Sequence, residues 1–423
     1  MKVLWICNLI PARIAAALQQ REQQNKEGWV SSAMKKVTEH GEIDLAVAFP
    51  RKSDELLHGR YHGVSYYSFY EDSDHPEDYD PSLEGALGHI CEEFYPDVIH
   101  CFGTEYPHTL AILKLSEWRD RVLVHIQGVM SKCAEVYDAG LPADVTERST
   151  FRDLLRRDAI WQQKEKYEKR AAREAEAVGL ARYVSGRTAF DKEFIATLHP
   201  SCTYYAMNET LRGSFYRAAW KPHAGGHRIF LAQGNIPLKG AHFAIEALAA
   251  VREKYPDAEL FVAGDNILRG KGLTERLKLS GYGRYLRSLI ARKHLETAVS
   301  FVGQQTEEEM KEQYLSADVC LLASVMENSP NSLGEAMLLG IPCVATEVGG
   351  VSSLAEDGKE VLLAPAQDPQ ALADRILQIF DDPAKAAEMG AAARKRAALT
   401  HDAEANYRML CWIYESIVKE TGD

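Results

Sequence analysis

Short apolar runs of strand length alternate with longer amphipathic stretches throughout the chain. The first series of runs comprises KVLWIC (2–7), IDLAVAF (43–49), VIHCF (98–102), VLVHI (122–126) and RYVSG (182–186). The second series comprises HRIFLAQG (227–234), AELFVAG (258–264), SFVG (300–303), VCLLAS (319–324) and IPCVAT (341–346). Because strands that alternate with helices form parallel sheets, each series predicts a doubly wound α/β domain.

A polar, glycine-containing connection near residues 206–226 separates the two series. We therefore predict an N-terminal Rossmann-like domain over residues 1–206 and a second one over residues 207–400. Residues 401–423 form a predicted terminal helix, whose apolar positions recur at helical spacing and require a surface to pack on. Ligands of open α/β sheets bind outside the carboxyl ends of the strands, which predicts a site in the crevice between the domains.

Residues 151–178 form a long charged segment with few glycines or prolines, which predicts one helix. Its basic side chains allow two interpretations. In the first, the helix is solvated and carries ion pairs between residues four apart. In the second, it presents a basic face to an anionic acceptor or to a membrane surface.

Composition excludes several classes of function. The formal net charge of −12 disfavours nucleic acid as a partner, because phosphate binding requires a basic surface. No stretch approaches the roughly 18–20 apolar residues of a membrane span. The apolar start of the chain is interpreted as a strand rather than a leader, because Pro11 ends it. The 8 cysteines show no paired metal-ligand spacing. These features predict a soluble cytoplasmic protein and leave peripheral membrane contact open.

The stretch MENSPNSLGEAMLLGIPCVATEVGG (326–350) carries the most informative chemistry. Polar sequence gives way at Ser332 to good helix formers. The backbone N–H groups of residues 331–333 are therefore expected at a helix N-terminus, where phosphate groups bind. A capping box between Ser332 and Glu335 is the alternative interpretation. That alternative leaves Glu327 and the pair of glycines at 349–350 unexplained.

This stretch resembles the retaining glycosyltransferases of family 4, within the glycosyl transferases group 1, whose hallmark is two glutamates separated by seven residues. Glu327 and Glu335 have that spacing, and the E-A-M, G-I-P and G-G elements of the family follow them. The stretch LAEDGKEVLLAPAQDPQALADRI (354–376) resembles the turn, strand and helix start that come next in the family. The resemblance implies a GT-B fold: two doubly wound Rossmann-like domains face an interdomain cleft, and the terminal helix packs back on the N-terminal domain.

The resemblance also implies roles for individual residues. Glu335 would accept hydrogen bonds from the ribose hydroxyls of the donor, and Glu327 would meet hydroxyls of the transferring sugar. Lys239, in QGNIPLKG (233–240), would supply a positive charge to the diphosphate. The other donor-binding candidates are Gly28, Gly234, Asn235, Asn331, Ser332 and Leu333.

The chain departs from the family pattern at three positions. Asn235 stands where members often carry an arginine, so one phosphate-neutralising charge is missing unless Arg269 or Arg284 replaces it. Pro330 replaces a common glycine and has no N–H to offer a sugar hydroxyl. Glu27 interrupts a loop that is glycine-rich in relatives.

In the first domain, relatives often carry a His-Gly pair near the reacting carbon, after the strand that corresponds to VLVHI (122–126). Here Gln127 precedes Gly128, and His125 lies two residues before Gln127. If the loop aligns on the glycine, Gln127 takes the catalytic position. If strand length decides the alignment, His125 does. Both are catalytic candidates, together with Lys239 and Glu327.

The stretch GTEYPHTL (103–110) follows another strand of the first domain. Glu105 and His108 are the acceptor-side candidates in it, and a packed loop is the alternative. The segment Asp72-Ser73-Asp74 matches a metal-binding D-x-D pattern, but it lies in an acidic loop with Glu71 and Asp78 and is interpreted as solvated surface.

These features predict a retaining glycosyltransferase that moves a hexose-type sugar from a nucleotide-sugar donor, with UDP as the default nucleotide, to a glycan or small-molecule acceptor. No metal and no other cofactor is required, because Lys239 and the helix N-terminus stabilise the leaving diphosphate. A GT-B sugar-nucleotide epimerase and a catalytically idle GT-B scaffold that binds a glycan or a partner are the alternatives. The stretches at 181–195 and 203–216 resemble a bacterial subgroup associated with surface polysaccharide assembly.

Overall fold

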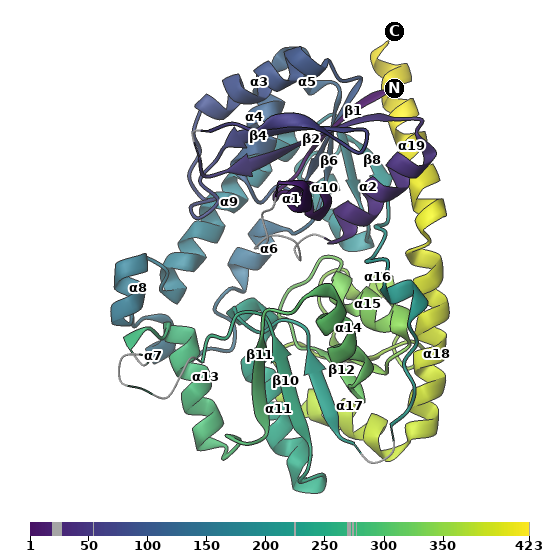
Figure 1. Ribbon diagram of the computed structural model, residues 1–423. Helices are drawn as coiled ribbons and strands as arrows, with labels where there is room; N and C mark the ends of the chain where they lie inside the picture. Colours follow the sequence, from purple (N-terminus) through teal and green to yellow (C-terminus); the bar gives the residue numbers. More distant parts are fainter. Residues whose placement is uncertain are drawn as a thin grey trace. The chain divides into compact units, whose positions relative to one another are not determined.

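The computed structural model of the chain describes residues 1–18, 28–53, 55–223, 226–268, 272, 275 and 277–422. The chain forms two α/β units, each built around its own sheet (Figure 1). Unit 1 comprises Met1–Ser131, Tyr167–Arg212 and His401–Asp423, and unit 2 comprises Lys132–Lys166 and Gly213–Thr400. No helix in the described part of the chain combines the length and the apolar run that a membrane span needs.

The sheet of unit 1 has the strand order β3-β4-β2-β1-β5-β6-β7-β8. Its strands are β1 (Lys2–Ile6), β2 (Asp44–Arg51), β3 (His58–Tyr61), β4 (Val64–Tyr70), β5 (Val98–Phe102), β6 (Val122–His125), β7 (Tyr183–Gly186) and β8 (Thr203–Ala206). Only β3 and β4 pair antiparallel. Because β1 pairs with both β2 and β5, the strand order changes direction between β1 and β5, which makes this the topological switch point.

Alternation along β1 divides the core of unit 1 into two apolar clusters, one on each face of the sheet. Val3 and Trp5 belong to one cluster, and Leu4 and Ile6 belong to the other. Three helices contribute to the first cluster: α1 (Ala12–Ala17), α2 (Gly28–His40) and α19 (Ala403–Thr421). The second receives α3 (Ser82–Phe94), α4 (Pro107–Lys114), α9 (Ile160–Leu180) and α10 (Ala189–Leu198).

The terminal helix α19 is fixed to the sheet of unit 1 by a buried tyrosine. The hydroxyl of Tyr414 accepts a hydrogen bond from Trp5 Nε1 at 2.8 Å and lies 2.7 Å from His100 Nδ1. All three side chains are buried. These polar contacts inside an apolar cluster fix how far along the sheet the helix lies, because sliding it would leave buried polar atoms without partners.

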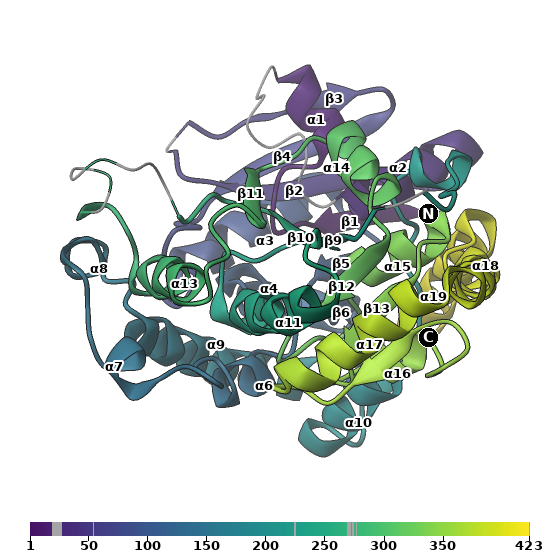
Figure 2. The same ribbon diagram turned by 90° about the horizontal axis from the view of Figure 1, so that it is seen from below.

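The sheet of unit 2 is parallel throughout, in the order β11-β10-β9-β12-β13-β14. Its strands are β9 (Arg228–Leu231), β10 (Glu259–Ala263), β11 (Val299–Gly303), β12 (Val319–Leu322), β13 (Cys343–Thr346) and β14 (Leu362–Ala364). The switch point lies between β9 and β12. Helices α11 (Ala241–Lys254) and α17 (Pro369–Asp381) lie on one face, whereas α15 (Asn331–Leu339) and α18 (Pro383–Thr400) lie on the other (Figure 2).

The other helices are short connections or covers. They are α5 (Ser116–Arg119), α6 (Met130–Glu135), α7 (Ala143–Thr146), α8 (Phe151–Arg156), α13 (Gly281–Arg292), α14 (Glu307–Leu315) and α16 (Val351–Leu354), with the 3-10 turns η2 (Phe215–Arg217) and η3 (Pro237–Lys239). The ten apolar runs of the sequence coincide with strands to within a few residues, whereas β3, β4, β8 and β14 lie outside those runs.

The single helix predicted over residues 151–178 is wrong, because the structure has two helices there. Arg157 adopts a left-handed backbone, with φ of 52°, and ends α8. Ion pairs of this segment join residues at other spacings or on other elements. Arg152 pairs with Asp153 and Asp158, Lys164 pairs with Asp138, and Glu176 pairs with Lys114.

The contacts also divide the chain differently from the expected boundary at residue 206. Residues 132–166 belong to unit 2, and the chain passes directly from unit 1 to unit 2 after Arg212. Thr150 accounts for part of this assignment, since its Oγ1 donates to the carbonyl of Leu279 at 2.9 Å. No sequence pattern marks such a tertiary contact.

Candidate active site

Three loops of unit 2 meet at the carboxyl ends of β9, β12 and β13. The backbone N–H of Val325, after β12, donates to the carbonyl of Leu238, after β9, at 2.9 Å. The N–H of Gly350, after β13, donates to the carbonyl of Glu327 at 3.1 Å. Backbone hydrogen bonds therefore tie the three loops together at the switch point of the sheet.

Two glycines permit this close approach. Gly349 has φ of 50°, and a Cβ atom there would lie 1.9 Å from the carbonyl oxygen of Glu327. Gly240 has φ of 67°, and its Cβ would lie 1.9 Å from the carbonyl oxygen of Ala323. Any other residue at either position would push the loops apart. The glycine at 349, which a capping box leaves unexplained, is thus required by the loop that carries Glu327.

Lys239 and Glu327 meet at this point. Lys239 Nζ donates to Glu327 Oε1 at 2.6 Å, and Ser324 Oγ donates to the same oxygen at 2.7 Å. The Lys239 side chain is 24% exposed and that of Glu327 is 9% exposed. An ammonium group and a carboxylate thus lie side by side where α/β sheets bind ligands, with the lysine partly open to solvent.

Helix α15 begins beside this pair. Its N-cap is Pro330, which makes no side-chain capping hydrogen bond, so the capping box between Ser332 and Glu335 is wrong. Tyr314 is buried against Phe230, and its hydroxyl donates to the carbonyl of Ser332 at 3.0 Å. The first turn of α15 is therefore held in place by a side chain from α14.

The donor-binding candidates in α15 differ in their hydrogen bonds within the helix and in their burial. The N–H of Leu333 donates to the carbonyl of Pro330 at 3.0 Å, so the amides of Asn331 and Ser332 precede the first turn-closing bond. Glu335 is buried within α15.

The loop after β9 contains the other donor candidates of unit 2. Gly234 is buried, and a Cβ there would lie 2.4 Å from Val262 Cγ1. Asn235 Oδ1 is buried and has no hydrogen-bond partner among the described residues. Arg284 is exposed on α13. Arg269, the other arginine considered as a replacement charge, lies outside the described residues.

In unit 1, His125 and Gln127 both contact Glu209. Gln127 Nε2 donates to Glu209 Oε1 at 2.7 Å, and His125 Nε2 lies 3.2 Å from the same oxygen. His125 Nδ1 lies 2.9 Å from Ser185 Oγ, so both ring nitrogens are engaged and the ring is fully buried. Gln127 is only partly buried.

Glu209 is the centre of a buried network that the sequence did not reveal. Arg187 donates through Nη1 to Glu209 Oε2 at 2.7 Å, and both side chains are buried. His401, at the start of the last segment of unit 1, lies with Nδ1 2.8 Å from the Glu209 carbonyl. Burial lowers the pKa of His401. Because these contacts join segments far apart in sequence, no local motif indicates them.

Glu105 and His108, the acceptor-side candidates, have different hydrogen-bond partners in the structure. Glu105 Oε1 accepts from the N–H of Gly128 at 2.7 Å, whereas its buried Oε2 has no partner among the described residues. Burial raises the pKa of Glu105. His108 is fully buried, with Nδ1 3.0 Å from Glu71 Oε2 and Nε2 3.2 Å from Asn8 Oδ1. The ring of His108 thus belongs to the first turn of α4, which is a helix rather than the packed loop considered as the alternative.

Glu174, on α9, holds the loop after β6. It is fully buried and accepts from Thr104 Oγ1 at 2.7 Å and from the N–H of Met130 at 3.0 Å. Burial raises its pKa to about 7, and the neighbouring Glu105 adds to this rise. Glu174 therefore titrates near neutral pH beneath the loop that carries Gln127.

The start of α2 lies close to Arg212, where the chain passes from unit 1 to unit 2. Gly28 begins α2, and a Cβ there would lie 2.6 Å from Arg212 Cγ, the last residue before unit 2. Because that neighbour is a flexible side chain, it can move aside. Glu27, which interrupts the expected glycine-rich pattern, lies outside the described residues.

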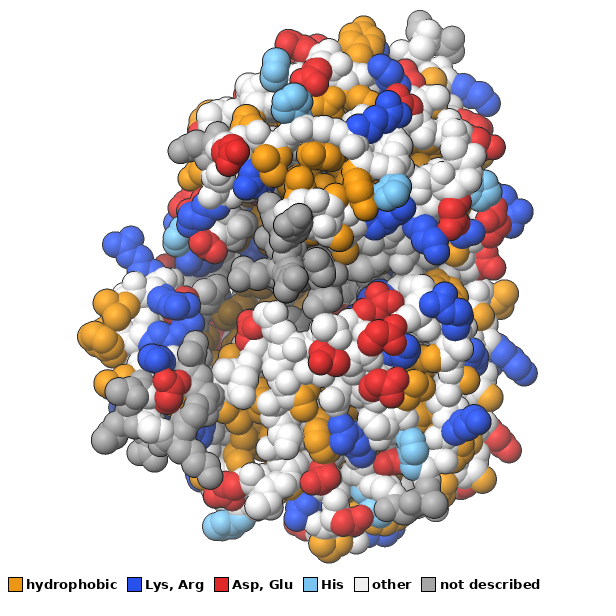
Figure 3. Space-filling model, in the orientation of Figure 1, with side chains coloured by type: hydrophobic (Ala, Val, Ile, Leu, Met, Phe, Trp, Pro, Cys, Tyr) orange, Lys and Arg blue, Asp and Glu red, His pale blue; other side chains and the backbone are white. Residues whose placement is uncertain are grey.

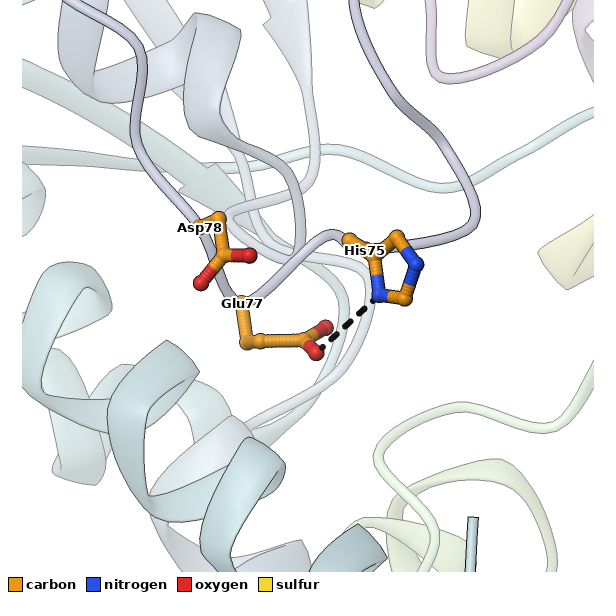
Figure 4. A group of neighbouring side chains, drawn as sticks. All are labelled: His75, Glu77 and Asp78. Carbon is orange, nitrogen blue, oxygen red and sulfur yellow. Dashed lines mark ion pairs between the residues drawn. The ribbon is translucent and has the colours of Figure 1, made fainter. Parts of the chain in front are cut away.

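The acidic loop after β4 is partly buried. His75, Glu77 and Asp78 place one potential metal-ligand atom each within 4.8 Å of one another, and His75 Nδ1 faces Glu77 Oε1 at 3.5 Å (Figure 4). In the D-x-D segment, which was interpreted as solvated surface, Ser73 and Asp74 are exposed and Asp72 is half-buried. The neighbouring Glu71 is buried and accepts from the N–H of His108 at 3.1 Å.

The D-x-D segment of the same loop is engaged with a lysine. Asp72 and Asp74 each lie 2.8 Å from Lys52 Nζ. These pairs lower the pKa of Asp72. A lysine between two carboxylates neutralises the charge that a metal ion would require.

The sequence of unit 2 matches a known family. Residues 219–396 match the family described as Glycosyl transferases group 1. The D-inositol 3-phosphate glycosyltransferase of Corynebacterium urealyticum is 33% identical over 180 residues, which cover 43% of this chain and 41% of the relative. A putative colanic acid biosynthesis glycosyltransferase, WcaL, of Salmonella typhimurium is 36% identical over 149 residues, which cover 33% of this chain and 32% of the relative. The match thus spans about two fifths or less of these curated relatives.

Two solved structures share the fold over nearly the whole chain. Sucrose-phosphate synthase from Thermosynechococcus elongatus superposes with a TM-score of 0.73 at 16% identity and covers 99% of this chain and 100% of its own. The Anabaena protein HepE in complex with UDP-glucose superposes with a TM-score of 0.66 at 17% identity, over 98% of this chain and 100% of its own. This likeness establishes the fold. The chain therefore has two Rossmann-like units of the GT-B fold, and its residues 219–396 match the family described as Glycosyl transferases group 1.

Proposed function

We propose that the protein is a retaining glycosyltransferase that moves a hexose-type sugar from a nucleotide-sugar donor, with UDP as the nucleotide, to a glycan or small-molecule acceptor in polysaccharide or glycoconjugate biosynthesis. The family match over residues 219–396 supports the transferase class. The similarity to a colanic acid biosynthesis enzyme supports the polysaccharide setting. The complex of HepE with UDP-glucose supports UDP as the nucleotide.

One observation carries this proposal: Lys239 Nζ and Glu327 Oε1 lie 2.6 Å apart between the ends of β9 and β12. An ammonium group has three N–H donors, so the same lysine side chain can bind both a carboxylate and a phosphate oxygen. Glu327 has a second carboxylate oxygen that can accept from a sugar hydroxyl. The pair thus offers a cation for the phosphate and a hydrogen-bond acceptor for the sugar, on the two sides of the bond between them.

The rest of the donor would lie along α15. The backbone amides of Asn331 and Ser332, at the positive end of the helix dipole, would bind the diphosphate. Glu335 would accept hydrogen bonds from the ribose hydroxyls. Asn235 Oδ1, a buried acceptor without a partner among the described residues, would accept from another donor-derived N–H or O–H group.

In the transfer step, the bond between the anomeric carbon and the leaving phosphate oxygen breaks. The acceptor oxygen forms its bond to the same face of that carbon, and the acceptor proton passes to the leaving phosphate. The transition state resembles an oxocarbenium ion next to a more negative diphosphate. Lys239 and the amides of α15 stabilise that charge, and the scheme uses no resident metal.

Of the two catalytic candidates in unit 1, Gln127 suits a role at the substrate better than His125. The His125 ring is fully buried, and both of its nitrogens are engaged by Ser185 and Glu209. Gln127 is partly exposed, and its Nε2 is oriented by Glu209. We assign Gln127 to sugar or acceptor binding and His125 to the support of the Glu209 network.

The first test measures the melting temperature of the wild-type protein with UDP, GDP, ADP and their sugars. A ligand present at 100 times its dissociation constant stabilises the native state by about 2.7 kcal/mol. We expect the shift with the UDP series and its loss in Glu335→Ala. Glu388→Ala, an exposed glutamate on α18, is the matched control and should keep the shift.

A second test follows the product by proton NMR, with a panel of glycan acceptors. The proposal predicts a glycoside with the anomeric configuration of the donor. An inverted product would refute the retaining mechanism. A nucleotide sugar or a free sugar of altered configuration would indicate an epimerase, and donor binding without turnover would indicate a binding scaffold.

A further inference from the structure

Helix α8 turns its apolar side chains toward solvent. Phe151 is 63% exposed, Leu154 is 63% exposed and Leu155 is 71% exposed. Trp161, in the first turn of α9, is 42% exposed. At the position that α8 occupies in Figure 1, Figure 3 shows hydrophobic side chains next to those of lysine and arginine. We call these four residues the α8 patch.

The opposite side of α8 anchors the helix to unit 2. Thr150 and Asp153 form a capping box, with Thr150 N donating to Asp153 Oδ2 at 3.0 Å and Asp153 N donating to Thr150 Oγ1 at 3.1 Å. The buried Asp153 also accepts from the N–H of Gly281, at the start of α13, at 2.9 Å. Thr150 Oγ1 donates to the carbonyl of Leu279.

This orientation is the reverse of an ordinary surface helix, which buries its apolar face. The polar side of α8 is buried and hydrogen-bonded, so rotating the helix to cover Leu154 and Leu155 would leave the Asp153 carboxylate without its partners. The cost of an unpaired buried charge opposes that rotation. The hydrogen bonds of Thr150 and Asp153 therefore fix α8 in the orientation that exposes the α8 patch to solvent.

Basic residues surround the α8 patch. Arg148, Arg156 and Arg157 are exposed. Arg156 also interacts electrostatically with the half-buried Asp158. Arg152 is already paired with Asp153 and Asp158. The chain as a whole carries a net charge of −12, so a cluster of exposed arginines beside exposed leucines differs from the average charge of the protein.

We propose that the α8 patch docks on an anionic lipid surface, with Phe151, Leu154 and Leu155 entering the interface and the arginines contacting lipid phosphates. Apolar side chains flanked by basic ones are the composition of segments that lie in membrane interfaces. Trp161 suits the same place, because its Nε1 is 3.3 Å from Ser149 Oγ and its ring remains exposed. This inference does not depend on the transferase reaction proposed above.

The test is cosedimentation of the full chain with vesicles, either of phosphatidylcholine alone or of phosphatidylcholine with about a third phosphatidylglycerol. We expect binding to the anionic vesicles that weakens as salt concentration rises. Leu154→Ser with Leu155→Ser should lower the bound fraction by about tenfold or more. Arg156→Gln with Arg157→Gln should lower binding to the anionic vesicles by about tenfold and leave the weak binding to neutral vesicles unchanged.

Leu399→Ser is the matched control, because Leu399 on α18 is 78% exposed and lies outside the α8 patch. It should bind vesicles like the wild type. Circular dichroism and thermal melting verify that each variant is folded, and the substituted side chains are exposed, so folding should be preserved. Failure of the wild type to bind anionic vesicles would overturn the proposal, as would unchanged binding by the double leucine variant.

A second measurement separates a lipid surface from a protein partner. Sedimentation velocity of the wild type without lipid, over a range of concentrations, reports association with a second copy of the chain. Dimers that the double leucine variant abolishes, together with absence of vesicle binding, would assign the α8 patch to self-association. Monomers at every concentration, together with binding to anionic vesicles, support the proposal.

Discussion

At the carboxyl ends of its strands, unit 2 presents Lys239 and Glu327 in loops that are tied together by backbone hydrogen bonds. At the corresponding edge of unit 1, Glu71, Glu174 and Glu209 lie buried, and each accepts hydrogen bonds from segments that follow the strands. In unit 2, glycines and backbone groups hold the loops, so charged side chains remain available for a ligand. In unit 1, buried carboxylates hold the corresponding segments in place through hydrogen bonds.

This difference has a measurable consequence. A substitution among the buried carboxylates of unit 1 should change stability first, because it leaves donors buried without an acceptor. A substitution of the charged pair in unit 2 should change activity first and stability little. Similar residue types at the same edge of a doubly wound sheet thus do not imply the same role.

The largest expected effect is on stability, in Glu209→Ala. Removing this carboxylate breaks the ion pair with the buried Arg187 and removes the acceptor that Gln127 and His125 share. The free energy of unfolding should fall by about 3–5 kcal/mol. Urea denaturation measures it, with Glu193→Ala on the exposed side of α10 as the control. A loss below about 1 kcal/mol would contradict the supporting role.

The next effect is on turnover, in Lys239→Ala. By analogy with the loss of one preorganised donor to a developing oxyanion, turnover should fall by about 10²–10³-fold. Stability should change by only about 1 kcal/mol, because Lys239 is partly exposed and Ser324 still donates to Glu327. Steady-state kinetics and denaturation measure the two quantities, and Lys293→Ala, on the exposed end of α13, serves as the control. A fall in turnover below tenfold would remove Lys239 from the mechanism.

The third effect is a pH dependence that belongs to unit 1. The folded-state pKa of Glu174 is raised from 4.5 to about 7, so the native state favours the protonated carboxyl. The contribution of Glu174 to the free energy of unfolding is fully present below pH 4.5 and is lost as pH rises through about 7. It amounts to about 3 kcal/mol. The unfolding free energy of the wild type minus that of Glu174→Gln should therefore fall between pH 5 and pH 7. A difference that is constant over this range would show that Glu174 keeps its ordinary pKa.

The smallest expected effect is on stability, in a variant that separates the structural residues of unit 2 from its ligand-binding residues. Thr150→Ala removes the N-cap of α8 and should cost about 1 kcal/mol of stability. Because Thr150 supports α8 and not the loop of Glu327, the melting-temperature shift on addition of a nucleotide sugar should be unchanged. Loss of that shift would show that structural and ligand-binding residues of unit 2 are coupled.

Much of the fold could be predicted from the pattern of apolar runs, because strands buried on both faces read as continuous apolar segments. The run VIHCF coincides with β5, and the other runs lie within a few residues of their strands. The break between α8 and α9 could not be predicted, because Arg157 in a left-handed conformation carries no strong sequence signal. The assignment of residues 132–166 to unit 2 depends on tertiary contacts such as that of Thr150 with Leu279.

The candidate site could be predicted where it is local in sequence and not where it is assembled from distant segments. Glu327, Glu335 and Gly349 lie in one stretch, and the structure explains the glycine by its contact with Glu327. Glu209 could not be predicted, since its partners Arg187, Gln127 and His125 are 22, 82 and 84 residues away along the chain. The roles of all these residues in a reaction remain predictions for the experiments above.

The contact between Trp5 and Tyr414 also bears on the order in which the protein can fold during synthesis. The two residues are separated by 409 positions, and α19 completes one of the two apolar clusters of unit 1. A ribosome therefore releases every residue of unit 2 before unit 1 has its last helix. Until then, α1 and α2 cover that face of the first sheet without α19, and the part that α19 will cover remains exposed. That part is the surface on which a nascent-chain chaperone has the longest time to act.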